Sequence, residues 1–225
     1  MAYDTIIFDM DGTLINSRGK GEISYRWARD ALKKTMKKFG VEWRNGIDGI
    51  FLSLITKKGV KGLEEFCKMY KIEDIHSFWR ERERDVIEAK ISAIDSGEIT
   101  LYDSVRRIVG YLSNKYALAI VSDSQQECVE HAVRHFDLVP YFRVWYGRGS
   151  ELEDLKKLKP EPDYILRVLE ELGSNRAVLV DDSPYSILAA EKAGIDSILL
   201  LRGKKEILKE PNYIVDDLME LKKIL

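Results

Sequence analysis

Cysteine is scarce in this 225-residue chain, and its two cysteines, Cys67 and Cys128, lie far apart in helix-like segments. Their spacing excludes a disulfide framework and the close pairs typical of zinc sites. We expect buried thiols in a reducing cytoplasm. The chain also lacks a basic segment followed by a long apolar run near its start, because Asp4, Asp9 and Asp11 interrupt it. No apolar run reaches the roughly 20 residues of a membrane span, so we expect neither a signal peptide nor a membrane protein.

An excess of charge of one sign is missing as well. Lys and Arg number 36 against 38 Asp and Glu, which gives a net charge of −2. This balance gives no electrostatic reason to expect nucleic acid as the main partner. Hydrophobic residues make up 45% and charged residues 33% of the chain, as in soluble globular proteins. The length suits one large domain or two smaller ones.

What the chain does contain is an acid-rich turn after a short apolar run, Thr5–Phe8. A run this short and this apolar predicts a strand buried on both faces, and Gly12 allows the sharp turn after it. Asp9 and Asp11 are two residues apart, so their side chains point the same way in extended chain. The two acids could simply cap a turn. Alternatively, they hold a divalent cation, since hard cations such as Mg²⁺ prefer carboxylate oxygens.

The segment from Ser17 to Gly97 contains no convincing strand. Apolar residues recur there at helical spacing, which predicts helices at about 23–39, 46–56, 63–70 and 74–94. The last of these helices is heavily charged over residues 80–84, which is typical of a solvated face with local ion pairs. We expect a purely helical unit in this part of the chain.

After Gly97 the pattern changes to alternating helices and strands. Helices are predicted at about 104–115, 125–135, 163–172 and 183–193, and strands at 117–121, 143–146, 177–180, 197–201 and 213–215. This alternation predicts an α/β fold with a parallel sheet covered by helices on both faces. Such sheets bind ligands beyond the carboxyl ends of their strands. Asp9, Ser122 and Asp182 each lie at or just past such an end, so we expect them to gather around one site.

These residues suit the hydrolysis of a phosphate ester. Asp9 can attack phosphorus, and Asp11 can protonate the leaving oxygen and later take a proton from water. Ser122 can donate a hydrogen bond to a phosphoryl oxygen, and Lys159 adds a cation. Taken singly, each has a plainer interpretation: Lys159 as a surface lysine, Ser122 as a turn residue and Asp182 as a helix cap. The order in which they occur favours the catalytic interpretation.

The segment 8–17, Phe-Asp-Met-Asp-Gly-Thr-Leu-Ile-Asn-Ser, closely resembles the first motif of the haloacid dehalogenase superfamily, mostly phosphatases that act through an aspartyl-phosphate. By chance, D-x-D-G-T would arise in about one in several hundred sequences of this length. Val121-Ser122 resembles the second motif and Lys159-Pro160 the third. Residues 180–184, Val-Asp-Asp-Ser-Pro, followed by Ala-Ala at 189–190 and Ala-Gly at 193–194, are similar to the fourth.

The resemblance implies a role for each matching residue. Asp9 is the implied nucleophile and a Mg²⁺ ligand, and Asp11 is the acid/base, with its backbone carbonyl on the metal. Asp182 is the third implied Mg²⁺ ligand. Ser122 and Lys159 are implied phosphate-binding residues, together with the position after Ser122, which is Asp123. A Rossmann-like core formed by residues 1–16 and 98–225 is implied, with an all-α cap domain inserted at 17–97.

The chain departs from the family pattern in two places. Asp123 stands where Asn is frequent, and an extra carboxylate weakens phosphate binding unless it points away or meets a cation. Ser186 stands where a second acid is frequent, which would loosen Mg²⁺ binding. Asp181, in place of a common Gly, is a candidate replacement, but adjacent residues on a strand point in opposite directions.

The leading hypothesis is therefore a Mg²⁺-dependent phosphatase acting on a small phosphorylated metabolite. A 2-haloacid dehalogenase needs no metal, and the clustered acids argue against it. A phosphosugar mutase is also compatible with these residues, as is a phosphate-binding or regulatory protein with little turnover. His76, His131 and His135 are interpreted as surface or packing residues without chemistry.

Overall fold

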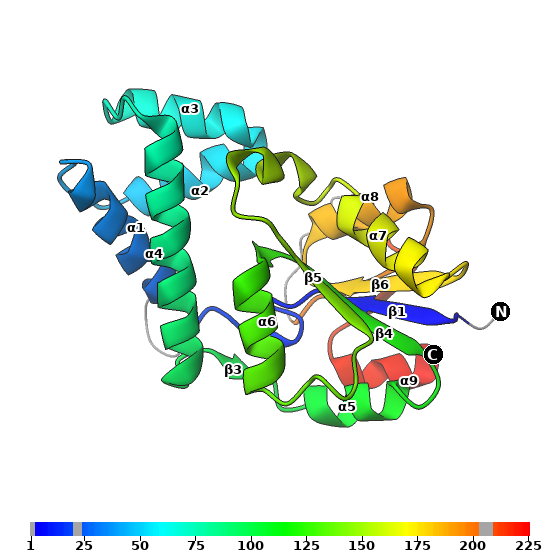
Figure 1. Cartoon of the computed structure of the whole chain (residues 1–225). Helices are drawn as coiled ribbons and strands as arrows, with labels where there is room; N and C mark the ends of the chain where they lie inside the picture. The colour runs from blue at the N-terminus through cyan, green and yellow to red at the C-terminus, as the bar shows by residue number, and fades with distance from the viewer. Residues whose placement is uncertain (1–2, 20–23, 203–208) are drawn as a thin grey trace.

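The computed structural model describes residues 3–19, 24–202 and 209–225. Its centre is a sheet in which every neighbouring pair of strands is parallel (Figure 1). The strand order is β5 (Val144–Arg148), β4 (Ala117–Gln125), β1 (Thr5–Phe8), β6 (Ala177–Asp181), β7 (Asp196–Leu200) and β8 (Tyr213–Val215). The predicted Rossmann-like parallel sheet is confirmed, and β1 lies between β4 and β6.

Helices cover both faces of the sheet because side chains along each strand alternate between them. Ile6 and Phe8 of β1 face one apolar cluster, whereas Ile7 between them faces another. The first cluster contains residues of α5 (Val105–Leu112), α6 (Gln126–His135) and α9 (Leu221–Ile224). The second contains residues of α7 (Asp163–Leu172) and α8 (Pro184–Ala193).

The helices predicted before Gly97 are present and lie to one side of the sheet (Figure 1). They are α1 (Arg26–Lys38), α2 (Ile47–Lys58), α3 (Val60–Met69) and α4 (Ile75–Asp95), which we call the helical unit. Residue 23, where the first helix was expected to begin, lies outside the described residues. Phe51, Phe66 and Phe78 pack edge to face or tilted within the unit's own apolar cluster.

The helical unit also takes in residues from beyond Gly97. Leu152 and Leu155 of the 3₁₀ helix η1 (Leu152–Lys157) are buried in its cluster. Conversely, Ala93 and Ile94 at the end of α4 belong to the core cluster. The domain boundaries at residues 16/17 and 97/98 stay a prediction. Each of these two apolar clusters contains residues from both sides of the boundary at 97/98.

Several short elements were not predicted from the sequence. β2 (Ile15–Asn16) pairs antiparallel with β3 (Thr100–Leu101), where the chain enters and leaves the helical unit. Two-residue strands carry no periodicity, and the 3₁₀ helix η2 (Leu218–Glu220) and α9 are too short to show any. Strand β4 continues to Gln125 rather than ending at Val121, with a shift of register between these two residues.

Two features bear on the expectations from composition. Cys67 and Cys128 are free and buried, and burial raises their pKa values to about 11 and about 12. Among the residues that the structure describes, none of the helices has the length and apolar character required to cross a bilayer.

Candidate active site

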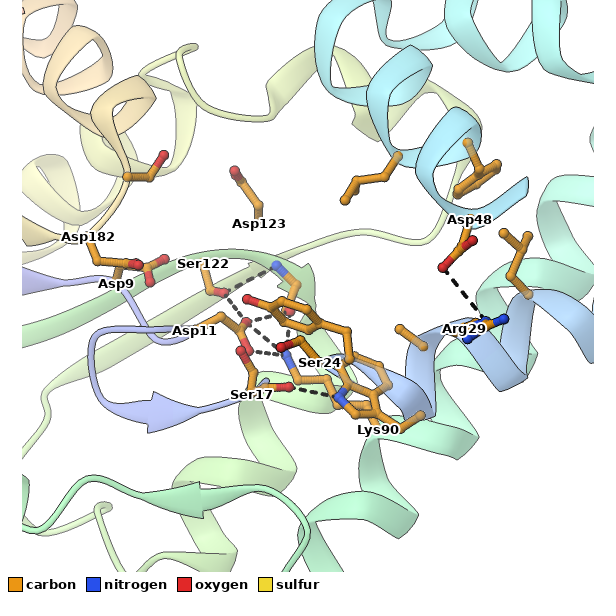
Figure 2. A pocket seen from close by; sticks show the side chains of 18 of the residues that line it. Asp9, Asp11, Ser17, Ser24, Arg29, Asp48, Lys90, Ser122, Asp123 and Asp182 are labelled. Atoms are coloured by element: carbon orange, nitrogen blue, oxygen red, sulfur yellow. Dashed lines mark hydrogen bonds and ion pairs between the residues drawn. The ribbon is translucent and has the colours of Figure 1, made fainter. Parts of the chain in front are cut away.

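The carboxyl ends of the central strands β4, β1 and β6 open into one cavity of about 620 Å³ between the sheet and the helical unit (Figure 2). The expected site residues all line this cavity: Asp9, Asp11, Ser122, Asp123, Lys159 and Asp182. The parallel register explains why they meet, since Phe8, Ile120 and Val180 lie side by side in the sheet. Strand β1 ends at Phe8 and β6 at Asp181, whereas β4 continues to Gln125 with a shift of register after Val121.

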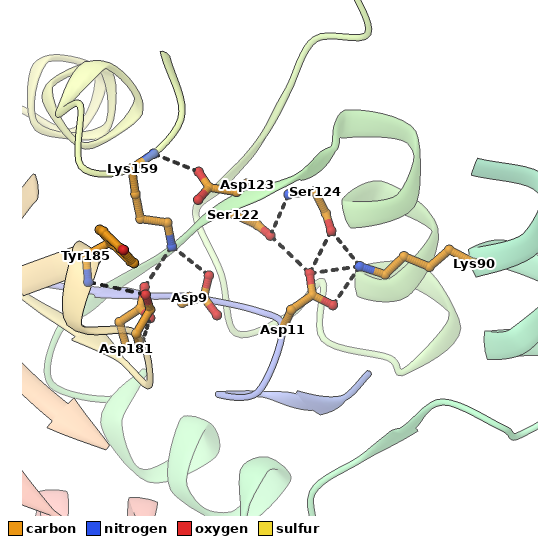
Figure 3. A network of polar contacts seen from close by, with 10 residues as sticks. Asp9, Asp11, Lys90, Ser122, Asp123, Ser124, Lys159, Asp181 and Tyr185 are labelled. Atoms are coloured by element: carbon orange, nitrogen blue, oxygen red, sulfur yellow. Dashed lines mark hydrogen bonds and ion pairs between the residues drawn. The ribbon is translucent and has the colours of Figure 1, made fainter. Parts of the chain in front are cut away.

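Lys159 connects two acids at the floor of the cavity (Figure 3). Its Nζ donates to Oδ1 of Asp9 and to Oδ2 of Asp181, both at 2.7 Å, and all three side chains are buried. Burial and then the negative charge of Asp181 raise the pKa of Asp9 well above its usual range, although Lys159 opposes this. Burial alone would lower the pKa of Lys159, but Asp181 and Asp9 outweigh it and raise that pKa well above normal.

Asp11 is held by a different set of partners. Lys90 Nζ donates to both carboxylate oxygens of Asp11, at 2.6 and 2.8 Å. Ser124 Oγ donates to it at 2.7 Å and Ser122 Oγ at 3.4 Å. Burial works against ionisation, but Lys90 overcomes it and the pKa of Asp11 is lowered. Lys90 therefore favours the ionised form of the Asp11 carboxylate.

Two further residues at the site, Lys90 and Ser124, were not predicted from the sequence. Lys90 comes from α4 and is only 1% exposed. A signal was present, because Lys90 lies on the stripe of α4 that also carries the buried Val86 and Ile94 at four-residue spacing. A lysine on the buried stripe of a helix needs an anionic partner. No pattern in the sequence pointed to Asp11 as that partner.

Asp123 is directed toward the backbone of the Lys159 loop. Its Oδ1 accepts a hydrogen bond from the Lys159 amide N–H at 3.1 Å. Burial raises the pKa of Asp123, and the nearby Lys159 charge only partly offsets this. The contact holds the segment that carries the Lys159 side chain. The phosphate-binding role of Asp123 stays a prediction.

Three carboxylates form a group suited to a cation. Asp9, Asp181 and Asp182 each offer an oxygen, and these oxygens lie within 4.8 Å of one another. The expectation that Asp181 points away from Asp182 was wrong. Strict alternation applies along a strand, but β6 ends at Asp181 and Asp182 already belongs to the turn. The all-oxygen donor set fits a hard divalent cation such as Mg²⁺.

Gly12 fits closely against this group. A Cβ atom at Gly12 would lie 2.6 Å from Oδ1 of Asp182, and the φ angle of Gly12 is +91°, which L side chains rarely adopt. Ser186, at the position of the frequent second acid, is buried in α8. Within the described residues its Oγ has no hydrogen-bond partner.

The turn after β1 has a further support that the sequence did not reveal. Arg202 donates from Nε to the Gly12 carbonyl at 3.0 Å and from Nη2 to the Thr13 carbonyl at 2.9 Å. Its guanidinium also lies 3.6 Å from the centre of the Tyr102 ring. Every residue has a backbone carbonyl that can accept a hydrogen bond, so no sequence motif could have predicted that Arg202 binds these two.

On the side of the helical unit, two arginines share one buried acid. Arg148 binds Glu83 through two hydrogen bonds of 2.6 and 2.9 Å, and Gln125 donates to Glu83 at 3.1 Å. Arg82 donates to the same carboxylate at 2.5 Å and lines the cavity. Burial opposes ionisation of Glu83, but the two arginines lower its pKa. Two cations against one anion leave a surplus of positive charge beside the cavity.

Comparison with known proteins agrees with this geometry. A protein of Caldanaerobacter subterraneus subsp. tengcongensis, provisionally named pyrophosphatase PpaX, is 30% identical over 100% of this chain and 96% of its own. The phosphoglycolate phosphatase of Aquifex aeolicus is 28% identical over 98% of this chain and 95% of its own. The crystal structure of CbbY from Rhodobacter sphaeroides in complex with phosphate has a TM-score of 0.74 at 23% identity, covering 98% and 96% of the two chains.

Fold and site together define the class: an α/β enzyme with an acidic site at the carboxyl ends of a parallel sheet and a helical unit facing it. Residues 6–200 match the family described as haloacid dehalogenase-like hydrolase, and the chain belongs to this family. The resemblance noted in the four sequence motifs is thereby confirmed, and the named relatives above carry phosphatase and pyrophosphatase names.

Proposed function

We propose that this hydrolase is a Mg²⁺-dependent phosphatase that cleaves a small phosphorylated metabolite through an aspartyl-phosphate on Asp9. The observation that carries the proposal is the setting of Asp9. It is buried, hydrogen-bonded to Lys159, and within reach of a cation that Asp181 and Asp182 would share. A phosphoryl group needs positive charge on its outer oxygens and an in-line nucleophile, and this setting provides both.

In the first step, a carboxylate oxygen of Asp9 forms a bond to phosphorus while the bond to the leaving oxygen breaks. The ionised Asp11 carboxylate takes up a proton from the bound phosphate monoanion and passes it to that oxygen, and the leaving alcohol or acid departs. In the second step, Asp11 takes a proton from water, whose oxygen attacks phosphorus and releases inorganic phosphate from Asp9. Lys90 and Ser124 hold the Asp11 carboxylate in place for both transfers.

Two more groups contact the phosphoryl group in this proposal. The Ser122 hydroxyl and the Lys159 ammonium line the cavity and can donate to its oxygens. Asp9, Asp182 and Asp181 would hold Mg²⁺ through their carboxylates, and Asp11 would add its backbone carbonyl, as the family resemblance implies. Mg²⁺ bound there would offset the repulsion between the phosphate dianion and the attacking carboxylate.

We further propose that the substrate carries a second anionic or strongly polar group on its leaving part. Arg82 lines the cavity, and burial, only partly offset by Glu83, lowers its pKa. Since Glu83 is already bound by Arg148 through both oxygens, Arg82 can gain stabilisation from a ligand anion. The apolar lining around it, including Trp27 and Phe51, excludes water from this contact.

The experiment is phosphate release from a panel of phosphate esters and pyrophosphate, with and without Mg²⁺, for the wild type and Asp9→Asn. We expect release that needs Mg²⁺ and falls below detection in the variant. If the wild type in Mg²⁺ releases no phosphate from any compound, the proposal fails. Halide release from 2-chloropropionate would then indicate a dehalogenase, and a product with the phosphate moved within the sugar would indicate a mutase. Phosphate binding without turnover would indicate a regulatory protein.

A further inference from the structure

A second group of metal-ligand residues lies away from the active-site cavity. Asp95 is the last residue of α4, and His131 and His135 lie one turn apart on α6, which packs beside α4 (Figure 1). Nε2 of His131 is 2.7 Å and Nδ1 of His135 is 3.3 Å from the same Asp95 oxygen, Oδ1. All three side chains are at least 31% exposed.

The geometry is that of a set of ligands around one point. Residues four apart on a helix face the same way, so the spacing of His131 and His135 brings both rings to one face. Their ring centres are 5.8 Å apart, and one ligand atom from each of the three residues lies within 4.8 Å of the others. One histidine would be enough to give Asp95 a hydrogen-bond partner. Here a ring nitrogen of His131 and one of His135 both face the same Asp95 oxygen, as ligands around a single ion would.

We infer that Asp95, His131 and His135 form a second metal site, for a transition metal ion of which Zn²⁺ is the foremost candidate. Two imidazoles and one carboxylate are ligands that Zn²⁺ accepts, with a coordination position left for water. Mg²⁺ strongly prefers all-oxygen ligands and is a poor match. The site is therefore distinct in chemistry from the all-carboxylate group of Asp9, Asp181 and Asp182.

A metal ion at this position would connect α4 to α6. Helix α4 carries Lys90, which binds Asp11, and Glu83, which binds Arg148. An ion held by Asp95 on α4 and by the two histidines on α6 would join the end of α4 to a helix of the sheet core. Ligands that bind only the native state stabilise it, so the ion would fix the helix that holds the acid/base. The inference does not depend on the proposed hydrolysis.

Zn²⁺ binding to the chelator-treated full chain tests the inference by calorimetry. Asp182→Asn serves as the background protein, so that the active-site acids contribute less to the signal. We expect one binding event that His131→Ala/His135→Ala weakens at least about 100-fold, more than the loss seen when only supporting residues of metal sites are removed. The chain has three histidines, so His76→Ala is the matched control and should bind normally.

A second readout identifies the ligands directly. Co²⁺ in place of Zn²⁺ should give a visible absorption spectrum that is lost in the double histidine variant and in Asp95→Asn, but kept in His76→Ala. The inference is overturned if the background protein binds no Zn²⁺, or if the double variant binds it as tightly as the background does. Equal displacement of Zn²⁺ by Mg²⁺ would also overturn it. Because the three side chains are partly exposed, circular dichroism is expected to show that the variants remain folded.

Discussion

Lys90 and Asp11 form an ion pair between the helical unit and the turn after β1, with Nζ 2.6 Å from Oδ1 (Figure 3). The lysine is on α4 and the aspartate follows the first strand, 79 residues earlier. The ion pair therefore links the position of α4 to the position of Asp11, the proposed acid/base. A family motif predicts Asp11 alone, whereas the structure shows the pair.

Replacing Lys90 by Met should lower kcat by about 10- to 100-fold, which is no more than the roughly 100-fold minimum that a positioned acid/base contributes. Lys90 lowers the pKa of Asp11, so its removal should raise that pKa. The ionised carboxylate then persists only at higher pH, and the acidic limb of the rate profile should move upward. Lys90→Arg should restore part of the rate, and exposed Lys68→Met is the control. An unchanged profile in Lys90→Met would rule out this role.

Replacing Gly12 by Ala should weaken Mg²⁺ activation by at least about tenfold. The new methyl group would lie 2.6 Å from Asp182, and the positive φ adds strain of about 1–3 kcal/mol. Gly40 also has a positive φ, but nothing lies within 4 Å of a Cβ there, so Gly40→Ala isolates the strain. Phosphate release measured over a Mg²⁺ titration should separate the effect of the contact with Asp182 from the effect of backbone strain. Equal behaviour of both variants would mean that contact with Asp182 has no functional effect.

Replacing Arg82 by Gln should reduce kcat/KM by about 10- to 100-fold for esters with an anionic leaving part. This loss corresponds to the free energy of one charge-assisted hydrogen bond, about 1.5–3 kcal/mol. Esters with a neutral leaving part, such as a simple alkyl phosphate, should change little. Arg84→Gln, on the exposed side of α4, makes the same charge change and serves as control. An equal loss of kcat/KM for all esters would instead mean that Arg82 maintains the structure of the site and does not bind the leaving part.

Replacing Glu83 by Gln should destabilise the protein by about 3–5 kcal/mol, because it leaves the buried Arg148 and the partly buried Arg82 without their shared anion. The pKa of Glu83 is lowered in the folded state, so its stabilisation is present above its unfolded value of 4.5 and is lost as pH falls through the folded value. Urea unfolding at several pH values should show this acid-dependent loss in the wild type and a smaller one in the variant. Equal stability at neutral pH would refute the assignment.

Much of the fold followed from the sequence because periodicity and strand ends are local signals. The buried run at Thr5–Phe8 and the alternation after Gly97 gave the parallel sheet, and the rule for its carboxyl ends brought Asp9, Ser122 and Asp182 to one place. The helix caps Ser183 and Gly194 bounded α8 correctly.

What could not be predicted depends on contacts between distant segments. Lys90 and Arg202 reach the turn after β1 from 79 and about 190 residues away, and no local pattern encodes such partners. Asp181 was misjudged because alternation was extended one residue past the end of its strand. Leu152 and Leu155 join the helical unit's cluster although they come from beyond it in sequence.

The central claim is that phosphate passes through a covalent bond to Asp9. The most direct test mixes the wild type with a cleavable ester and Mg²⁺, stops the reaction with acid within milliseconds, and maps modified peptides by mass spectrometry. The account predicts a phosphoryl group on the peptide that contains Asp9, located at Asp9, which decays with the release of phosphate and is absent from Asp9→Asn. Turnover without any phosphorylated protein, or a phosphoryl group on another residue, would contradict it.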